Sequence, residues 1–582
     1  MLTAAQMLPL NHPASALVVG PPGSGKTLLL VHKAAQLTAK GQTVALSTFA
    51  FRGLEFLRHF AQGHYPQLTA HVATGLLKAG TVVELAQAQL ATTGTVNFAS
   101  NNQVREILRS LILTQGFTGT LPEAEHIIRN AKGRAKKMPE NDKHYPLLTA
   151  YQAKLEEFGL LDRYDIIRKH ILGMKNATVP PLQVKHILLD NLEDANEIQL
   201  IWLQIHQNQG IQLTLAANDD TTAYARDGAL GPLAINQVED WPDITRFNLP
   251  TSFRTPPALA PALGKIARQL RTRHPKAEET TSTTPATLQV ENFPNPAAEH
   301  AFLATTCSQL LGQNPNHSIG IITRNDFSAA LITHALRKKG LNPASFARLI
   351  WEDPTPQLML ALLYVLLNQA NNAHLQLALL GFGIPAATVN EWLNTGLTAE
   401  DWLPRGCPLP PIAGLSPTIQ SAAQRAKQSF SGAYQLWQAK ALGPREIFKS
   451  LVAEALPNIP EADHPQALLA TDMLLTLSGK LTEILPRVMI ETMPNMQSPI
   501  TVAPVRETRN MQFNTTIMPY AGANLWPHPP YTVLGPDADH ERRLFLLAIS
   551  RTAGNLILTH HTPQPTPYLA ELKQALKPTP RK

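Results

Sequence analysis

Short aliphatic runs alternate with longer segments of helical period in the first part of the chain. ALVVG at 16 to 20 is an apolar run that ends in glycine, and the leucines and alanines after it recur at helical spacing until Gly41. TVALSTF at 43 to 49, HILLD at 186 to 190 and IQLTLAAN at 211 to 218 have the composition of further strands. Strands that alternate with helices predict an α/β fold with a mostly parallel sheet covered by helices on both faces.

Two long helical patterns interrupt this alternation. Residues 81 to 180 predict a helical insertion within a first sheet domain made of residues 1 to 80 and 181 to 270. The Thr- and Pro-rich residues 271 to 299 predict a linker. A second sheet domain is predicted at 300 to 370 and 491 to 582, with a smaller helical insertion at 371 to 490; its expected strands are SIGIITR at 318 to 324, TTIMPY at 515 to 520, YTVLG at 531 to 535 and NLILTH at 555 to 560.

Length and charge change this picture little. A chain of 582 residues exceeds the size of one hydrophobic core, so we expect three or four packed units. The net charge of +7 favours a polyanionic partner, although an ordinary basic soluble protein fits it equally well.

Cysteines and hydropathy exclude several classes of protein. The two cysteines, Cys307 and Cys407, have no CxxC spacing, which disfavours a disulfide framework, a zinc site or an iron–sulfur site. The longest aliphatic run, LMLALLYVLL at 358 to 367, is too short to span a bilayer. We therefore expect a soluble, cytoplasmic protein that does not enter a membrane.

The first predicted strand leads into a phosphate-binding motif. GPPGSGKT matches GxxxxGK[ST] between a predicted strand and a predicted helix, which is the context this motif requires. Backbone N–H groups of such a loop bind phosphate oxygens, the lysine reaches the terminal phosphates and the threonine hydroxyl binds Mg²⁺. The predicted ATP-binding residues are Gly20, Pro21, Pro22, Gly23, Ser24, Gly25, Lys26 and Thr27.

Asp190 follows the third predicted strand and is the candidate partner of Thr27 in holding Mg²⁺. An aspartate after a buried strand also caps helices, and that structural role is the alternative.

Other segments, in order along the chain, resemble motifs of the UvrD/Rep/PcrA family of superfamily 1 DNA helicases. LTAAQ at 2 to 6 resembles the family's glutamine motif, and YQAKLEEFGLLDRYDII at 151 to 167 resembles the end of its helical 1B insertion. LSTFAFRGLEF at 46 to 56 resembles the motif beside single-stranded DNA. PTSFRTPPALAPAL at 250 to 263 resembles the NYRS segment, and ERRLFLLAISRT at 541 to 552 is similar to ERRLxYVAxTRA.

The resemblance implies two RecA-like P-loop domains that bind ATP and Mg²⁺ between them. It implies that Gln6 reads adenine and that Arg254 and Arg551 reach the γ-phosphate, so that Lys26, Asp190, Arg254 and Arg551 form the catalytic set. The implied DNA-binding positions are Thr48, Phe49, Arg52 and, more weakly, Tyr224, although both aromatics also suit a core. The implied partner is single-stranded DNA or a junction of single- and double-stranded DNA, with travel from 3′ to 5′.

Several positions depart from the family pattern. The second motif, DExQD in the family, reads DNLED here, so Asn191 replaces the glutamate that orients or deprotonates the attacking water. Glu193 or Glu197 is a candidate substitute. Thr221 stands where a γ-phosphate-sensing glutamine is expected, Arg226 replaces an aromatic, TVVELA at 81 to 86 lacks a histidine, and ETRNMQF at 507 to 513 carries Asn510 and Gln512 in place of glycine and glutamate.

The retained residues bind phosphate, whereas the lost ones activate water and connect the nucleotide to DNA. The sequence therefore predicts an ATP-dependent DNA helicase or translocase with weakened hydrolysis, in repair, recombination or defence. The alternative is a degenerate ATP- and DNA-binding subunit of a repair or nuclease complex. A small-molecule kinase is disfavoured by the motif at 541 to 552.

Overall fold

The computed structural model describes residues 2–114, 117, 121–276, 279–411, 414–477, 479–486, 488, 498–523, 525–527 and 538–576. The expected strand at 531 to 535 lies outside these residues. The chain divides into two compact units, one made of Met1–Ala301, Gln313–Arg324 and Ala503–Lys582, the other of Phe302–Gly312 and Asn325–Val502. Within the described residues, no helix is both long and apolar enough to cross a bilayer.

The predicted α/β fold is confirmed, with two six-stranded parallel sheets. The first has the order β3-β2-β4-β5-β1-β6. Its strands are β1 (Ser15–Val19), β2 (Val44–Thr48), β3 (Leu77–Thr81), β4 (His186–Leu189), β5 (Gln212–Ala217) and β6 (Ile244–Asn248).

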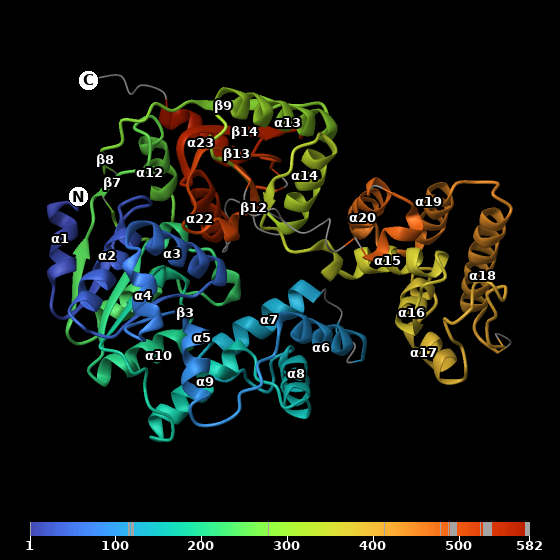
Figure 1. Ribbon diagram of the computed structural model, residues 1–582, viewed down its shortest axis with the longest axis horizontal. Coiled ribbons are helices and arrows are strands. Elements are labelled where there is room, and N and C mark those ends of the chain that lie inside the picture. The colour runs from blue at the N-terminus through green and yellow to red at the C-terminus, as the bar shows by residue number, and fades with distance from the viewer. Residues whose placement is uncertain are drawn as a thin grey trace. The chain divides into compact units, whose positions relative to one another are not determined.

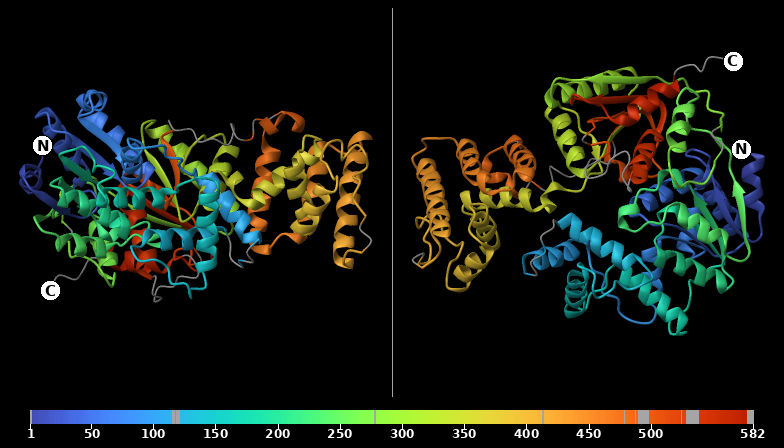
Figure 2. Two further views of the ribbon diagram at one scale, coloured as in Figure 1. Left: turned by 90° about the horizontal axis from the view of Figure 1, so that it is seen from below. Right: turned by 180° about the vertical axis from the view of Figure 1, so that it is seen from behind.

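Helices cover both faces of the first sheet (Figure 1, Figure 2). Successive strand residues alternate between two cores, because side chains in a strand point to opposite faces. Leu188 packs in the core that includes Leu30 and Leu57, whereas Ile187 and Leu189 pack in the other. The helices before the insertion are α1 (Ala4–Asn11), α2 (Lys26–Ala39), α3 (Phe51–His64) and α4 (Gln67–Ala73), and those after β4 are α10 (Glu197–Asn208), α11 (Pro232–Glu239) and α12 (Ala260–Arg268).

Most of the described residues between β3 and β4 are helical. Their helices are α5 (Val82–Leu90), α6 (Asn101–Thr114), α7 (Leu121–Gly133), α8 (Tyr145–Glu157) and α9 (Arg163–Lys175). A separate small core around Leu108, Tyr151 and Leu155 holds α6, α7 and α8 together. The helix α5 begins at a capping box, in which Thr81 and Glu84 bind each other's backbone N–H groups.

The second sheet has the order β11-β12-β10-β13-β14-β9. Its strands are β9 (Leu288–Asn292), β10 (Ile319–Thr323), β11 (Ala344–Ser345), β12 (Ile500–Pro504), β13 (Phe513–Met518) and β14 (Thr552–His560). Its helices include α13 (Pro296–Gln313), α14 (Asp326–Lys338), α22 (Ala538–Ile549) and α23 (Pro567–Leu576). The expected linker at 271 to 299 therefore contributes a strand, because β9 pairs with β14 from Leu288 to Asn292.

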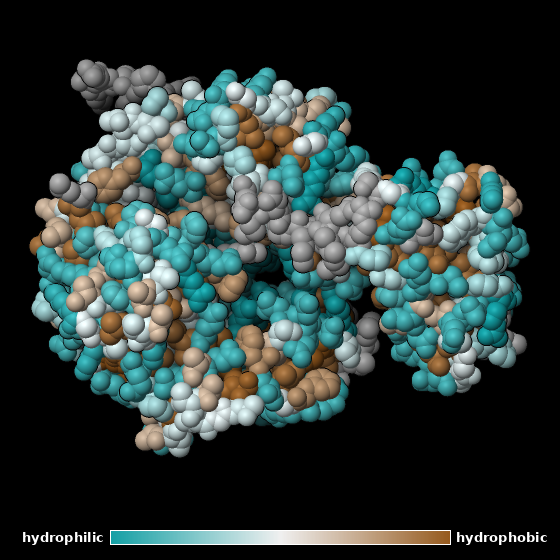
Figure 3. Space-filling view, in the orientation of Figure 1, coloured by the Kyte–Doolittle hydropathy of each residue, from teal (hydrophilic) through white to brown (hydrophobic). Residues whose placement is uncertain are grey.

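Helices make up most of the second unit. They are α15 (Pro354–Leu366), α16 (Asn372–Leu380), α17 (Ala386–Asn394), α18 (Pro417–Gln438), α19 (Pro444–Ala455) and α20 (His464–Thr476). They surround a core of fully buried aromatic side chains, in which the Phe430 ring contacts Phe382 and Trp402 at centroid distances of 5.4 Å each. On the face drawn in Figure 3, hydrophobic residues are interspersed with hydrophilic ones over most of the surface.

Gly320 in β10 allows Phe513 to pack against the strand, because a Cβ at this position would clash with the aromatic ring. We expect Gly320→Ala to lower the free energy of unfolding of this sheet by about 1 to 3 kcal/mol, the usual cost of overpacking. Hydrogen exchange of the β10 and β13 amides measures the loss. Gly312→Ala is the matched control, since nothing lies within 4 Å of a Cβ there; equal protection in the two variants would contradict the prediction.

Candidate functional site

The candidate site lies at the carboxyl ends of β4, β5 and β1, which are neighbours in the first sheet. Gly20 follows β1, Asp190 follows β4 and Asn218 follows β5. The N–H of Gly20 donates to the carbonyl of Ala217 at 3.2 Å, which joins the phosphate loop to the end of β5. Parallel sheets bind ligands at this edge, where the loops after the strands meet.

The phosphate loop leads directly into α2, whose first residue is Lys26. Gly25 precedes it with φ of 81°, and a Cβ there would also strike the Gln6 amide, so glycine is required on both counts. The Lys26 ammonium donates to the carbonyls of Gly20 at 2.7 Å and Pro21 at 2.8 Å, and lies 3.3 Å from the Ser24 hydroxyl. The lysine is thus folded onto the loop that its motif assigns to phosphate.

Gln6 lies against this loop. Its amide nitrogen donates to the Ser24 carbonyl at 3.0 Å, while its amide oxygen accepts from the Thr3 backbone at the start of α1. The buried Lys33 holds the other end of α1 by donating to the carbonyls of Pro9 and His12.

Thr27 and Asp190 meet at the predicted magnesium position. The Thr27 hydroxyl donates to Asp190 Oδ2 at 2.7 Å. Burial raises the pKa of Asp190, and the hydrogen bond from Thr27 opposes this shift. A hydroxyl and a carboxylate are ligands that suit the hard Mg²⁺ ion, so these residues fit the metal that the motif implies.

Three cations near the loop have lowered pKa values; Lys26 and Arg254 are half-buried, and Arg551 is buried. Burial lowers the pKa of Lys26 to about 8 and that of Arg254 to about 10. The pKa of Arg551 is lowered well below its usual value, first by burial and then by repulsion from Arg254 and Arg509. The carboxylates of Glu193 and Asp190 oppose the lowering of the pKa of Lys26 and of Arg551, so the site combines cations with carboxylates.

Arg254 and Arg551 come from different parts of the chain, and Arg254 lies beside Gly23 of the loop. Arg254 follows the short strand β7 (Thr251–Ser252), where the Phe253 N–H donates to the Gly23 carbonyl at 2.9 Å and the Ser252 hydroxyl donates to Pro22 at 2.8 Å. Arg551 lies just after α22 and donates to the carbonyls of Leu547 at 3.2 Å and Met511 at 3.4 Å.

Asn191 adopts a left-handed conformation, with φ of 65°. Asparagine tolerates this conformation much better than glutamate does. Asn510, which stands where the resembling motif has glycine, is likewise left-handed, with φ of 64°. The asparagine at 510 therefore preserves the backbone geometry that glycine would allow.

Glu193 and Glu197, the candidate substitutes for the missing glutamate, lie in different environments. Glu193 is fully buried; its Oε2 accepts from the Asn218 N–H at 2.9 Å and its Oε1 lies 2.9 Å from Arg509 Nη1. Glu197 instead accepts from the Ala135 N–H at 2.7 Å, outside the phosphate site. Thr221 is buried and exchanges hydrogen bonds with Asn218.

The four candidate DNA-binding residues differ in exposure. Thr48 is buried at the end of β2, and Phe49 is half-buried against the core of the first sheet. Arg52 lies on α3, and its side chain is outside the described residues. The half-buried Tyr224 packs against the core that contains Phe545, and its hydroxyl lies 3.4 Å from the Arg506 carbonyl.

Two exposed aromatics were missed by the sequence analysis. Phe51 is 55% exposed at the start of α3, and Phe253 is 43% exposed beside the phosphate loop. Both lie within two positions of a residue that the motifs selected, Phe49 and Arg254. A flat exposed ring at either position is able to stack on a nucleic acid or nucleotide base.

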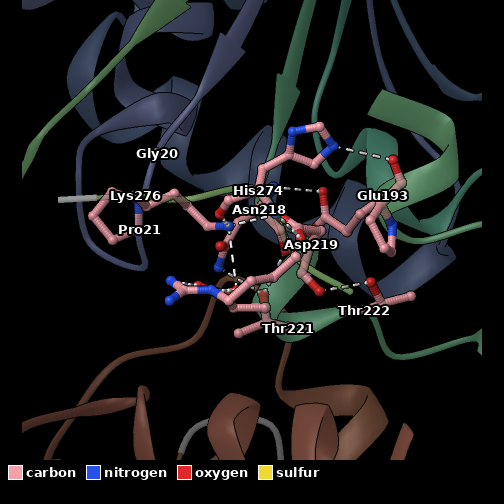
Figure 4. Close-up of polar contacts among 12 residues, drawn as sticks. Gly20, Pro21, Glu193, Asn218, Asp219, Thr221, Thr222, His274 and Lys276 are labelled. Carbon is pink, nitrogen blue, oxygen red and sulfur yellow. Dashed lines mark hydrogen bonds and ion pairs between the residues drawn. The ribbon is translucent and has the colours of Figure 1, made fainter. Parts of the chain in front are cut away.

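A buried ion cluster around Asp219 joins the loop after β5 to residues 273 to 276 (Figure 4). The Lys276 ammonium lies 2.5 Å from Asp219 Oδ1, and the His274 N–H donates to Oδ2 at 2.9 Å. Arg543 Nε of α22 donates to the Asp219 carbonyl at 2.9 Å. Residues 273 to 276 were assigned to a linker, and their role could not be read from local sequence because the partners are distant.

The left-handed turn at Asn191 has a measurable consequence. We expect Asn191→Gly to keep the stability of the protein within about 1 kcal/mol, whereas Asn191→Glu costs about 1 to 2 kcal/mol because glutamate lacks the short polar side chain whose local hydrogen bonds let asparagine adopt the left-handed conformation. Denaturant unfolding of the two variants beside the unchanged protein measures the difference. An Asn191→Glu protein as stable as the glycine variant would show that the turn relaxes.

No protein-family model matches the chain. Over 201 residues, 34% of the chain, it is 22% identical to the ATP-dependent DNA helicase srs2 of Schizosaccharomyces pombe, of which it covers 22%. Over 240 residues, 37% of the chain, it is 27% identical to DNA helicase II of Haemophilus influenzae, of which it covers 33%. The chain thus spans about a fifth to a third of the length of these curated relatives. Together with the two parallel sheets, these similarities make the chain a distant relative of the UvrD-family DNA helicases over about a third of its length.

Proposed function

We propose that this protein is an ATP-dependent translocase or helicase that moves on single-stranded DNA, from 3′ to 5′ by analogy with its relatives, and that it hydrolyses ATP slowly. The observation that carries the proposal is the geometry of the phosphate loop: Lys26 begins α2 directly after it, the Thr27 hydroxyl donates to Asp190, and Arg254 follows Phe253, whose N–H donates to the Gly23 carbonyl. The negative charge of a bound triphosphate pairs with these cations.

Each retained residue has a defined task in this proposal. Lys26 would leave the loop carbonyls for the terminal phosphates, and Thr27 and Asp190 would hold Mg²⁺, which would supply neutralising charge there. Gln6 and the exposed Phe253 ring bind the adenine. Arg254 and Arg551 stabilise the charge that develops on the γ-phosphate during transfer.

The proposed movement along DNA depends on the two sheet domains, because each of them supplies some of these groups. Lys26 and Asp190 belong to the first sheet domain, whereas Arg551 follows α22 of the second. Binding and hydrolysis of ATP change the attraction between them, and single-stranded DNA held near Phe49, Phe51 and Arg52 is moved as the domains respond. The DNA backbone is bound through its charge and the bases through stacking.

The second candidate is a helicase-like subunit that binds ATP and DNA without useful hydrolysis and supports a nuclease or other repair partner. The observation that favours it is Asn191, whose amide is unable to accept a proton from water.

ATP hydrolysis with and without a short oligothymidine separates the two candidates. The translocase proposal expects phosphate release that the single strand stimulates several-fold, and loss of ATP binding in Lys26→Ala. Lys40→Ala is the matched control, because Lys40 is an exposed residue at the other end of α2. ATP binding without stimulated release would leave only the second candidate, and absence of ATP binding would refute both.

The pKa of Lys26 predicts a pH dependence of ATP binding. Bound phosphates favour the charged ammonium, so the pKa of Lys26 is higher in the complex than its value of about 8 without nucleotide. Binding is therefore tightest below pH 8, and the dissociation constant rises by up to about tenfold per pH unit above it. Titration with a fluorescent ATP analogue from pH 7 to 9.5 measures this slope. Lys26→Arg removes the titrating group and flattens the profile, and a flat profile in the unchanged protein would contradict the assignment.

A further inference from the structure

Glu193 is a buried carboxylate in the loop that carries Asn191. It is fully buried, and its two oxygens point to different parts of the protein. Oε2 accepts from the N–H of Asn218, at the end of β5, and Oε1 pairs with Arg509, which follows β12. Arg509 also lies 2.5 Å from Asp194 Oδ2, so one arginine holds both carboxylates of this loop.

Glu193 lies beside the phosphate loop. The Asn218 N–H that donates to Glu193 belongs to the residue after Ala217, whose carbonyl accepts from the N–H of Gly20 at the start of that loop. The loop after β4 that carries Glu193 also carries Asp190, which accepts from the Thr27 hydroxyl.

Glu193 retains the capacity to bind water. An ionised carboxylate offers about four acceptor positions, and the contacts with Asn218 and Arg509 occupy two of them. The pairing with Arg509 fixes the direction of the side chain, which is the condition that a water-orienting group must meet.

The neighbouring residues are less suited to this task. The backbone of Asn191 is left-handed, a conformation that a glutamate there would adopt only with strain. Glu197 is held by the N–H of Ala135. Asp190 is held by Thr27 at the magnesium position.

We propose that Glu193 is the carboxylate that orients and deprotonates the attacking water, and that it replaces the glutamate missing at position 191. The inference rests on the proposed ATP hydrolysis and deepens it. The water oxygen forms a bond to the γ-phosphorus while the bond from phosphorus to the β–γ bridging oxygen breaks. ADP leaves with that electron pair, and the proton of the water passes to Glu193 and then to solvent. Arg509 is a positioning residue that keeps the carboxylate aimed at the site.

The first test compares Glu193→Gln with Glu197→Gln in the full chain, with single-stranded DNA present. We expect Glu193→Gln to lower kcat for ATP at least a hundredfold, the usual effect of losing a catalytic base, with no change in the affinity for a fluorescent ATP analogue. Glu197→Gln is the matched control and keeps kcat within threefold. A fall of less than tenfold in Glu193→Gln would overturn the proposal.

A second test separates catalysis from a purely structural role of the ion pair. Arg509→Gln combined with Glu193→Gln removes both charges and leaves two amides that are able to bond to each other. If Glu193 only pairs with Arg509, the double variant recovers to the kcat of Arg509→Gln alone, and the proposal fails. If Glu193 acts on water, the double variant stays as slow as Glu193→Gln.

ATP hydrolysis by the unchanged protein shows whether a failure concerns Glu193 alone or the proposed function as well. ATP hydrolysis that is insensitive to Glu193→Gln refutes the role of Glu193 and leaves the translocase intact. An unchanged protein that binds ATP but releases no phosphate refutes both.

Discussion

The positive charge gathered near the phosphate loop is the constraint on which the rest of this structure depends. Lys26 and Arg254 are half-buried and Arg551 is buried; burial lowers the pKa of all three, and Arg254 further lowers those of Lys26 and Arg551. Such an arrangement persists only if the surrounding fold is rigid enough to enforce it. The two sheets supply this rigidity, because their strands are paired throughout and helices cover the first sheet on both faces.

Ion pairs between distant segments hold the loops that carry these cations. Arg509 binds Glu193 and Asp194, and burial nevertheless raises the pKa of Asp194 to about 7. Arg324 pairs with the buried Glu541 at the start of α22, and Arg543 of the same helix bonds to the Asp219 carbonyl. Arg551 follows this helix, so its position depends on contacts made nearly three turns earlier. Removing one partner of such a pair leaves an uncompensated buried charge, which is why the pairs fix geometry more than they add stability.

Contiguous features of the sequence predicted the fold and the phosphate loop well. A glycine-rich motif between a strand and a helix has one geometry, and Asp190 follows β4, which is separated from β1 of the motif by β5 alone and ends at the same edge of the sheet. Gln6 and Arg254 lie beside the loop, and the roles that the resemblance implies for them and for Arg551 stay predictions. The pairing of Glu193 with Arg509 joins residues 316 positions apart, and no local pattern reveals it. The role of Lys276 could not be predicted for a similar reason. A Thr- and Pro-rich segment is typical of a linker, yet this segment contributes a buried cation and a strand.

The backbone geometry shows that the residues differing from the family motifs differ in their structural effect. At position 510 asparagine replaces glycine and keeps the left-handed turn, so this difference removes little. At position 191 the same conformation disfavours a glutamate, while two residues later a glutamate is buried in the site. A loop that turned left at Asn191 and kept Glu193 fully exposed would indicate simple decay of a catalytic motif. The burial of Glu193 argues otherwise, because an enclosed carboxylate with a fixed arginine partner is costly to maintain without a task.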